Sequence, residues 1–581
     1  MKRIYRFACG WLLLAWATGL GVLQAAEADL ILHHGRIVTS DRQFSIHPAM
    51  AIRGERVVAV GSDQEILRGR GPHTTVVDLA GKMILPGLID SHTHPAEAAM
   101  TEFDHPIPEM ETIADVLRYF QSRAAVVPEG RWLVLQQVFI TRLREQRYPT
   151  RQELDRAAPR HPVVFRTGPD ASLNSLALQR SGIDRNFRVT DGGSGFAEKD
   201  PGTGEPTGIL RNCTRYVKIE ESGKAPSPED RERRMTELFQ DYNSVGLTGI
   251  CDRDTSPEDL DLYRRLRDGN RLPVRLSALW HIESIGPLDD ILKRIRQVAA
   301  EPLFLEKNPG LRVLGIKTYL DGGMLTGSAL MREPWGVSRI YAITDPQYRG
   351  VRFIPADRLA AMVRTAVESG LQFSAHTVGD GAVQALLEAY AEVNRTIPIA
   401  RTRPCISHSN FMSREAVDLL PRLGVSVDVQ PAWLYMDART LVSHFGYDRL
   451  RWFQPLRSIF AAGGVAGGGS DHMQKVGSLR SINPYNPFLG MATAIGRKAR
   501  WYAGPLHPEE ALSREQAIRM YTSYNAWLLF AEGELGSLEP GKLADFILLD
   551  TDLLSCPEDD IARTRVLETY LGGKRVYRRA P

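Results

Sequence analysis

The chain has 581 residues, of which 43% are hydrophobic and 24% are charged, as in an ordinary folded protein. Extensive disorder, a collagen helix and a coiled coil are therefore excluded for most of its length. The formal net charge is +3, and Lys2, Arg3 and Arg6 supply three positive charges to a leading segment without acids. The remainder is neutral, which gives no electrostatic reason to expect nucleic acid or an anionic membrane as a partner.

Residues 1–26 have the layout of a secretory signal peptide. A basic start is followed by an uncharged apolar run and then by small residues. We expect cleavage between Ala25 and Ala28 and a mature protein that is exported, to the periplasm or the medium. An uncleaved membrane anchor is the alternative, which the short, glycine-interrupted run disfavours. After cleavage we expect no stable membrane span.

The two ends of the mature chain share a β-rich character. Short β-type runs separated by glycine turns fill residues 27–85, and residues 533–581 repeat the pattern. We predict one small β domain composed of both segments. His33 and His34 lie in it, and we assign them structural roles.

Residues 86–532 alternate short apolar runs with helical patterns, which predicts an α/β fold, a (β/α)8 TIM-like barrel. Residues 95–245 are too many for one crossover between strands, so we expect an inserted subdomain over the barrel mouth. The eight candidate strands lie in ILPGLIDSHTHP, LTGICD, LPVRLSALWH, LRVLGIKTYLDGG, LQFSAHTVGD, RPCISHSN, LGVSVDVQP and GGVAGGGSDH.

His92 and His94 stand near the end of the first of these strands, in the sequence DSHTHP. Residues two apart in a strand face the same side, so both imidazoles can reach one metal ion. Pro95 cannot continue the hydrogen-bonded ladder, which places the pair at the carboxyl end of the strand, where barrel enzymes have their sites. Two polar residues at a strand end are the alternative interpretation.

Four further side chains of ligand type lie near the ends of other predicted strands: Lys317, His376, His408 and Asp471. Strand ends converge at a barrel mouth, so five strands would bring six such groups to one place. A lysine within an apolar strand is otherwise hard to explain, because burying its charge without a partner is costly. A salt bridge between Lys317 and Asp321 is the alternative. The set as a whole predicts a metal centre.

The ordered motifs PGLIDSHTHP, GIKTYLDGG, SAHTVGD, ISHSN and GSDH resemble the amidohydrolase superfamily. The resemblance is strongest to the branch called amidohydrolase family 3, which includes N-substituted formamide deformylase-like proteins. GSLEPGKLADFILLD is similar to the C-terminal segment of that branch, and the resemblance covers residues 28–578. It implies a metal-dependent hydrolase on a barrel with a composite β-sandwich domain.

The resemblance also implies two divalent metal ions. Zinc suits a histidine-rich, oxygen-bridged site, with manganese or iron as alternatives. Carried over by position, the first ion would be bound by His92, His94 and Asp471. The second ion would be bound by His376 and His408. Lys317, as a carboxylated lysine, would bridge the two ions.

The implied reaction is attack of a metal-bridging hydroxide on a carbonyl carbon. Metal binding lowers the pKa of water from 15.7 to roughly 7, so hydroxide forms at neutral pH. Asp471 would receive the proton and pass it to the leaving nitrogen.

One segment, HPVVFRTGPDASLNSLAL, departs from the family pattern, which has Gly-His before the Asn-Ser. Asp170 stands near the place of that histidine and is a candidate substrate contact, with a turn role as the alternative. His281, at the end of the third strand, either lines the pocket or is structural. His472 is either a supporting residue or a substrate contact.

We therefore expect an exported amidohydrolase that cleaves a C–N bond in a small amide, formamide or cyclic amide. A deaminase or an ester or lactone hydrolase on the same scaffold is one alternative. One-metal deaminases lack a bridging lysine, so the presence of Lys317 argues against that form. A non-catalytic metal- or ligand-binding protein is the other. The sequence leaves the oligomeric state open, a homo-oligomer included.

Overall fold

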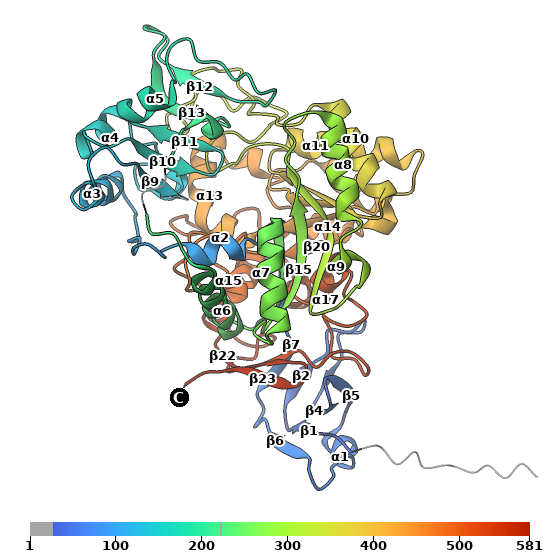
Figure 1. Ribbon diagram of the computed structural model, residues 1–581. Helices are drawn as coiled ribbons and strands as arrows, with labels where there is room; N and C mark the ends of the chain where they lie inside the picture. Colours follow the sequence, from blue (N-terminus) through green and yellow to red (C-terminus); the bar gives the residue numbers. More distant parts are fainter. Residues whose placement is uncertain (1–26, 137, 221–222, 581) are drawn as a thin grey trace, which may run out of the picture.

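The computed structural model describes residues 27–136, 138–220 and 223–580. The predicted signal peptide, residues 1–26, lies outside the described residues. The expected cleavage region, residues 25–28, therefore lies partly outside them. Three bodies are visible in Figure 1: a β domain at the bottom, a barrel in the middle, and an inserted subdomain at the upper left. None of the described helices is long and apolar enough to cross a membrane.

The middle body is a barrel of eight parallel strands. Its strand order, β20-β19-β18-β17-β16-β15-β14-β8, follows the chain from one edge to the other. A parallel bridge between Thr93 and His472 joins the two edges, and the backbone N–H of His94 donates to the carbonyl of His472 at 2.7 Å. The strands are β8(Leu88–Thr93), β14(Leu247–Thr255), β15(Arg275–His281), β16(Leu311–Tyr319), β17(Gln372–Thr377), β18(Cys405–His408), β19(Ser426–Val429) and β20(Ala466–Gly468).

Helices surround this barrel, most of them between successive strands (Figure 1). They alternate with the strands along the chain, so the predicted α/β barrel is confirmed. The helices of this body are α2(Pro95–Met100), α6(Pro228–Ser244), α7(Pro257–Asp268), α8(Leu288–Val298), α9(Pro302–Leu305), α10(Ala356–Glu368), α11(Asp380–Asn394), α12(Arg414–Leu423), α13(Pro431–Phe445), α14(Leu456–Ala461), α15(Pro487–Gly496), α16(Arg514–Met520) and α17(Ser523–Leu528).

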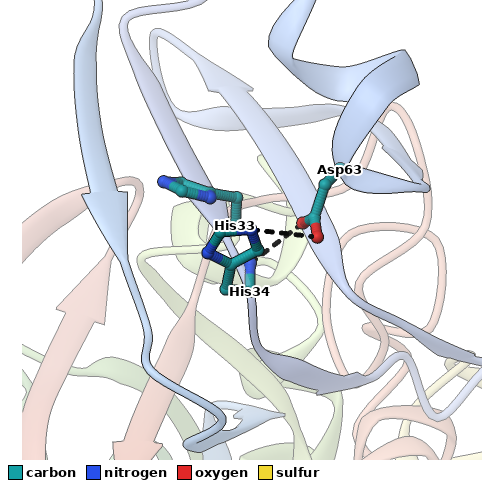
Figure 2. Close-up of side chains that lie close together, drawn as sticks. All are labelled: His33, His34 and Asp63. Atoms are coloured by element: carbon teal, nitrogen blue, oxygen red, sulfur yellow. Dashed lines mark hydrogen bonds and ion pairs between the residues drawn. The ribbon is translucent and has the colours of Figure 1, made fainter.

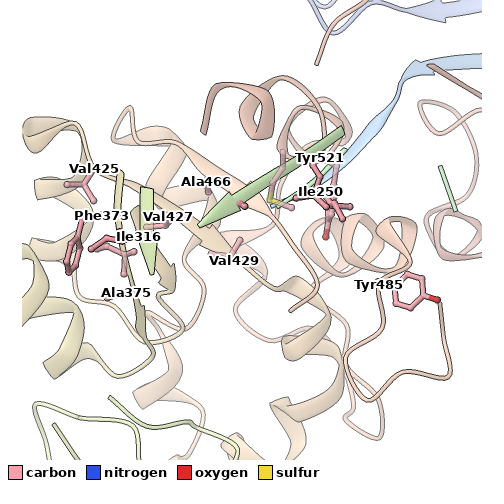
Figure 3. Close-up of a cluster of buried hydrophobic side chains, with 14 of the residues drawn as sticks. Ile250, Ile316, Phe373, Ala375, Val425, Val427, Val429, Ala466, Tyr485 and Tyr521 are labelled. Atoms are coloured by element: carbon pink, nitrogen blue, oxygen red, sulfur yellow. The ribbon is translucent and has the colours of Figure 1, made fainter. Parts of the chain in front are cut away.

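The alternation of side chains along each strand separates the apolar core from the polar interior of the barrel. Val427 and Val429 of β19 are fully buried in the apolar cluster shown in Figure 3, together with Phe373 and Ala375 of β17. Asp428 lies between the two valines and therefore faces the other way, into the barrel. Because side chains alternate along a strand, polar side chains point into the barrel and their apolar neighbours pack against the surrounding helices.

The apolar run before His92 forms two strands rather than one. β7(Met83–Pro86) belongs to the β domain, and β8 begins the barrel at Leu88. Gly87 lies at the junction, where a β-carbon would come within 2.1 Å of the Thr248 side chain. A larger residue is excluded there, so glycine allows the chain to pass closely over the barrel floor.

The β domain contains strands from both ends of the chain, as predicted. A four-stranded sheet has the order β5-β4-β1-β6, and a six-stranded sheet has the order β23-β22-β21-β7-β2-β3. The C-terminal β21 pairs with the N-terminal β7, which fastens the two segments together. The elements are β1(Leu30–His33), β2(Arg36–Val38), β3(Ile46–His47), β4(Ala49–Arg53), β5(Arg56–Gly61), α1(Asp63–Leu67), β6(Thr75–Asp78), β21(Phe546–Leu549), β22(Val566–Leu571) and β23(Lys574–Arg578).

The inserted subdomain lies between the first and second barrel strands in sequence and has its own five-stranded sheet, β12-β13-β11-β10-β9. In Figure 1 it stands on the side of the barrel opposite the β domain. Its elements are α3(Ile113–Ala124), β9(Leu133–Gln136), α4(Arg151–Ala157), β10(Val163–Thr167), β11(Asp170–Leu173), α5(Ser175–Ser181), β12(Phe196–Lys199) and β13(Pro206–Arg211).

Candidate metal centre and cavity

The structure brings the six predicted ligand side chains together at the carboxyl ends of five barrel strands. The imidazole centroids of His92 and His94 lie 5.1 Å apart, those of His92 and His408 4.7 Å, and those of His376 and His408 4.4 Å. Lys317 and Asp471 line the same cavity as His94, His376 and His408. Residues up to 379 positions apart in the chain thus meet because parallel strands of a barrel end at one mouth.

Asp471 stands between the two histidines of β8. Its Oδ1 lies 3.0 Å from His94 Nε2 and 3.3 Å from His92 Nε2. The side-chain amide of Asn483 donates to Asp471 Oδ2 at 3.2 Å and to its carbonyl at 2.7 Å. These three ligand atoms lie close enough together to hold one cation. Their types, two imidazoles and a carboxylate, suit zinc.

Lys317 is fully buried, and its Nζ has no hydrogen-bond partner among the described residues. The ring centroid of Tyr319 lies 5.2 Å from Nζ. Burial lowers the pKa of the Lys317 amine, which favours the neutral form over the ammonium ion. The alternative salt bridge with Asp321 is not formed, because that carboxylate accepts the backbone N–H groups of Leu330, Val378 and Gly379.

The imidazoles of His92, His376 and His408 are neutral at pH 7. Burial and the nearby Lys317 lower the pKa of His376 to about 3, and burial holds the pKa values of His92 and His408 well below the ordinary value. Trp433 stacks on the ring of His408, with 5.1 Å between centroids. Neutral imidazole is the form that binds a metal ion, so these rings need no deprotonation before binding.

A polar network beneath the centre sets the orientation of two of these rings. Asp428 Oδ1 lies 2.7 Å from His92 Nδ1, and Gln430 Oε1 lies 2.8 Å from His408 Nδ1. The second oxygen of Asp428 accepts a hydrogen bond from Ser407 at 2.9 Å and lies 3.1 Å from Arg253 Nε. Each ring therefore donates through Nδ1 and presents Nε2 to the centre. His92, His408 and Asp428 form a compact group of ligand type, but this carboxylate is occupied by the network.

The centre opens into a cavity of about 560 Å³ between the barrel mouth and the inserted subdomain. The barrel side contributes five of the six ligands, all except His92, together with Asp254, His281 and Tyr319. The insertion contributes Phe139, Arg166, Gly168, Pro169, Ser194, Asn212, Thr214 and Arg215. A cavity of this size suits a small molecule.

The three predicted substrate contacts lie in different places. His281 lines the cavity, and its Nδ1 lies 2.5 Å from Asp254 Oδ1. Asp170 is fully buried in the insertion, where it pairs with Arg211 at 3.3 Å and accepts the backbone N–H of Asn212, so its carboxylate does not face the cavity.

His472 is buried behind the centre, outside the lining of the cavity. Its Nε2 lies within hydrogen-bonding distance of the carbonyls of Gln474 and Lys475, at 3.0 and 2.8 Å. Nε2 therefore carries the proton, and Nδ1 accepts from the hydroxyl of Tyr242 at 2.7 Å. With both nitrogens occupied, this ring supports the loop that closes the barrel.

Sequence reasoning did not identify Asp428, Gln430 and Arg253. The signal for the first two is present: in LGVSVDVQP the polar residues alternate with valine, so they share the inner face of the strand. The side chain of Arg253 is buried against this network, and 0% of the residue is exposed to solvent. An arginine so placed is stabilised by Asp428, whose strand is remote in sequence.

A second group of ligand-type side chains lies on the β domain, and Figure 2 shows His33, His34 and Asp63. The His34 side chain is 57% exposed and pairs with Asp63 at 3.7 Å and with Asp78 at 3.2 Å. These are exposed contacts between a histidine and carboxylates, and exposed pairs of this kind contribute little to stability. Nothing about this group distinguishes it from a surface charge cluster.

The sequence model of the amidohydrolase family matches residues 75–577. The N-substituted formamide deformylase of Arthrobacter pascens is 28% identical over 565 residues, covering 95% of this chain and 98% of that protein. Protein LONG AFTER FAR-RED 3 of Arabidopsis thaliana is 26% identical, covering 95% and 92%. The solved structure of an uncharacterized metal-dependent hydrolase from Pyrococcus furiosus covers 90% of this chain and 100% of its own, with a TM-score of 0.63 and 22% identity, a likeness of fold.

Proposed function

We propose a finer function for this chain, which belongs to the amidohydrolase family and is a metal-dependent hydrolase acting on carbon–nitrogen bonds. Its substrate is a small amide, formamide or cyclic amide, and Asp471 carries the proton from the attacking water to the leaving nitrogen. The six ligand side chains hold two divalent ions, and zinc is the metal that suits these ligands best.

The observation that carries this proposal is the pair of buried polar atoms without hydrogen bonds, His92 Nε2 and Lys317 Nζ. Leaving such an atom unpaired costs about 1–3 kcal/mol, so buried polar atoms normally have partners. Both atoms belong to side chains at the same strand ends as His94, His376, His408 and Asp471. A bound cation would pair with His92 Nε2, and the donor set therefore fits a metal centre.

The residues of the chain perform three tasks in this reaction. Bound at these ligands, two ions would polarise the scissile carbonyl and increase the acidity of water. Asp471 accepts the proton at Oδ1 or Oδ2 and delivers it to the leaving nitrogen. Phe139, Met324 and Trp433 line the cavity and exclude bulk water. The inserted subdomain contributes part of the wall of this cavity.

We further propose that Lys317 is carboxylated and bridges the two ions. The lone pair of the neutral amine attacks the carbon of carbon dioxide, a C–N bond forms, and one proton leaves to solvent. The lowered pKa of Lys317 supports this step, because only the neutral amine is nucleophilic. The carbamate anion would replace an unpaired amine by an oxygen ligand between the two histidine groups.

Metal content and substrate range test the proposal together. We expect about two ions per chain, and hydrolysis of at least one substrate among N-acyl amines, formamides and cyclic amides. One ion per chain with release of ammonia from an amino-substituted ring would favour a deaminase. Turnover of lactones alone would favour the ester hydrolase, and absence of ions and turnover would favour a binding protein.

We also propose that the mature chain is exported. The support is the sequence of residues 1–26, with a basic start, an apolar run and small residues at its end. Expression of the full chain in a Gram-negative host, followed by fractionation and N-terminal sequencing, tests this. A periplasmic product that begins between residues 25 and 28 is expected, and a cytoplasmic product that begins at Met1 would contradict export.

A further inference from the structure

Arg166 places a positive charge on the wall of the cavity formed by the inserted subdomain. The residue lies on β10, lines the cavity and is half-buried. Its one recorded hydrogen bond runs from Nε to the carbonyl of Gly168, at 3.4 Å. Among the described residues, no carboxylate forms a salt bridge with its guanidinium.

The neighbouring charges on this wall are already paired. Arg215 also lines the cavity, but Asp191 accepts from its Nε at 2.6 Å and from Nη2 at 2.9 Å. Asp170, two residues beyond Gly168, is occupied by Arg211 and the backbone of residue 212. Of the cavity-lining residues between 139 and 215, the two arginines are the charged ones, so Arg166 contributes the uncompensated charge.

Two carboxylates on the barrel side, those of Asp254 and Glu283, have hydrogen-bond partners of their own. Asp254 lies against His281 and accepts from the hydroxyl of Tyr319 at 3.1 Å. Glu283 accepts the backbone N–H of Ile285 at 3.0 Å, and Glu97 lies on α2, which follows His94 directly. Among the described residues, no salt bridge joins Arg166 to any of these groups.

We propose that Arg166 binds a carboxylate group of the substrate, on the amine side of the scissile bond. The substrate class is then an amide acid, such as an N-acyl amino acid, rather than a neutral amide. Two features favour a carboxylate: the planar guanidinium matches it with two parallel hydrogen bonds, and a partly desolvated arginine without a counter-ion gains from an anionic ligand. The apolar lining from Phe139, Met324 and Trp433 receives the remainder of the molecule.

This inference deepens the proposed function and rests on it. The test compares two substrates that differ only in the carboxylate, N-acetylphenylalanine (each enantiomer) and N-acetyl-2-phenylethylamine. KM and kcat are measured for the metal-loaded wild-type chain and for Arg166→Gln, Arg166→Lys and Arg188→Gln. Arg188 is an exposed arginine of the same subdomain, outside the lining of the cavity, and serves as the matched control.

We expect the wild-type chain to prefer the carboxylate substrate, and Arg166→Gln to raise its KM by about 10- to 100-fold, the range for a charge-assisted hydrogen bond. The lysine variant should retain part of the preference, and Arg188→Gln all of it. For the neutral substrate, kcat/KM should change by less than about twofold.

Three results would overturn the assignment: a wild-type preference for the neutral amide, an equal loss on both substrates in Arg166→Gln, or an unchanged ratio between them. Each leaves amide hydrolysis itself intact. If the wild-type chain hydrolyses neither substrate, calorimetric titration with N-acetylphenylalanine tests the carboxylate site. Binding that is weaker in Arg166→Gln than in the wild type would support the site. Equal binding by both chains, or no binding by the wild type, would contradict it.

Discussion

The carboxylate of Asp428 lies 2.7 Å from His92 Nδ1, at the bottom of the centre, and both side chains are fully shielded from solvent. The contact determines which nitrogen of the imidazole carries the proton. With Nδ1–H donated to Asp428, the lone pair of Nε2 faces the centre, where it has no hydrogen-bond partner. A carboxylate behind a ligating histidine orients the ring and raises its basicity.

Asp428→Asn should weaken metal binding by about 10- to 100-fold, because the amide does not accept from Nδ1–H and Arg253 Nε equally well. Metal affinity is measured by competition with a chelator. Asp418→Asn, at an exposed position of α12 paired with Arg414, is the matched control. The apo protein should also lose stability, since the variant leaves Arg253 buried beside a neutral group. Unchanged metal affinity would exclude the orienting role.

Asp471→Asn should keep two bound ions and reduce kcat by at least about 100-fold, because the amide oxygen still faces the centre but the proton acceptor is lost. The experiment measures kcat on any substrate found, together with the metal content of the same preparation. Asp448→Asn, at an exposed position beyond α13, should leave both values unchanged. Full activity in Asp471→Asn would refute proton transfer by this carboxylate.

Lys317→Ala should lose the second ion and most activity, and short carboxylic acids such as acetate or propionate should restore part of both. The alanine leaves space where the carbamate would lie, and an added carboxylate supplies the same oxygen ligands. Metal content and kcat are measured with and without the acid. Lys293→Ala on the exposed face of α8 is the control. Two ions per chain in Lys317→Ala would end the bridging role.

Glu153 provides a test of pH dependence away from the centre. Hydrogen bonds from Arg147, together with those from Thr150, lower the pKa of this carboxyl from 4.5 to about 2. A carboxyl whose pKa is lower in the folded chain stabilises it above pH 4.5, and this contribution disappears as the pH falls toward 2.

Glu153→Gln keeps the N-terminal cap of α4 and removes the charge, because glutamine also accepts the backbone N–H of Thr150. We expect the variant to be less stable than the wild type by at most about 1 kcal/mol at pH 6 and to approach it at pH 3. Urea unfolding at both pH values measures the difference. Glu129→Gln, at a 64% exposed site, should show a smaller effect at pH 6. A penalty that is equal at pH 3 and pH 6 would contradict the stated cause.

The order of short apolar runs and helical patterns was sufficient to predict the barrel and its β domain, because each strand and helix carries its own periodicity. The apolar run ILPGLIDSHTHP predicts one strand, whereas the structure has two, divided at Gly87. No local pattern distinguishes these cases, since both strands are apolar, and the close approach of Gly87 to Thr248 is a contact between segments remote in sequence.

Sequence alone determined which side chains gather at the barrel mouth, because parallel strands end at one face and residues two apart share one side. Only the tertiary structure decided the partners of each charge. Asp170 and Arg166 lie four residues apart in one hairpin. Asp170 forms an ion pair with Arg211, whereas Arg166 lines the cavity. Ion pairing depends on distances of a few ångströms between remote segments, which periodicity does not specify.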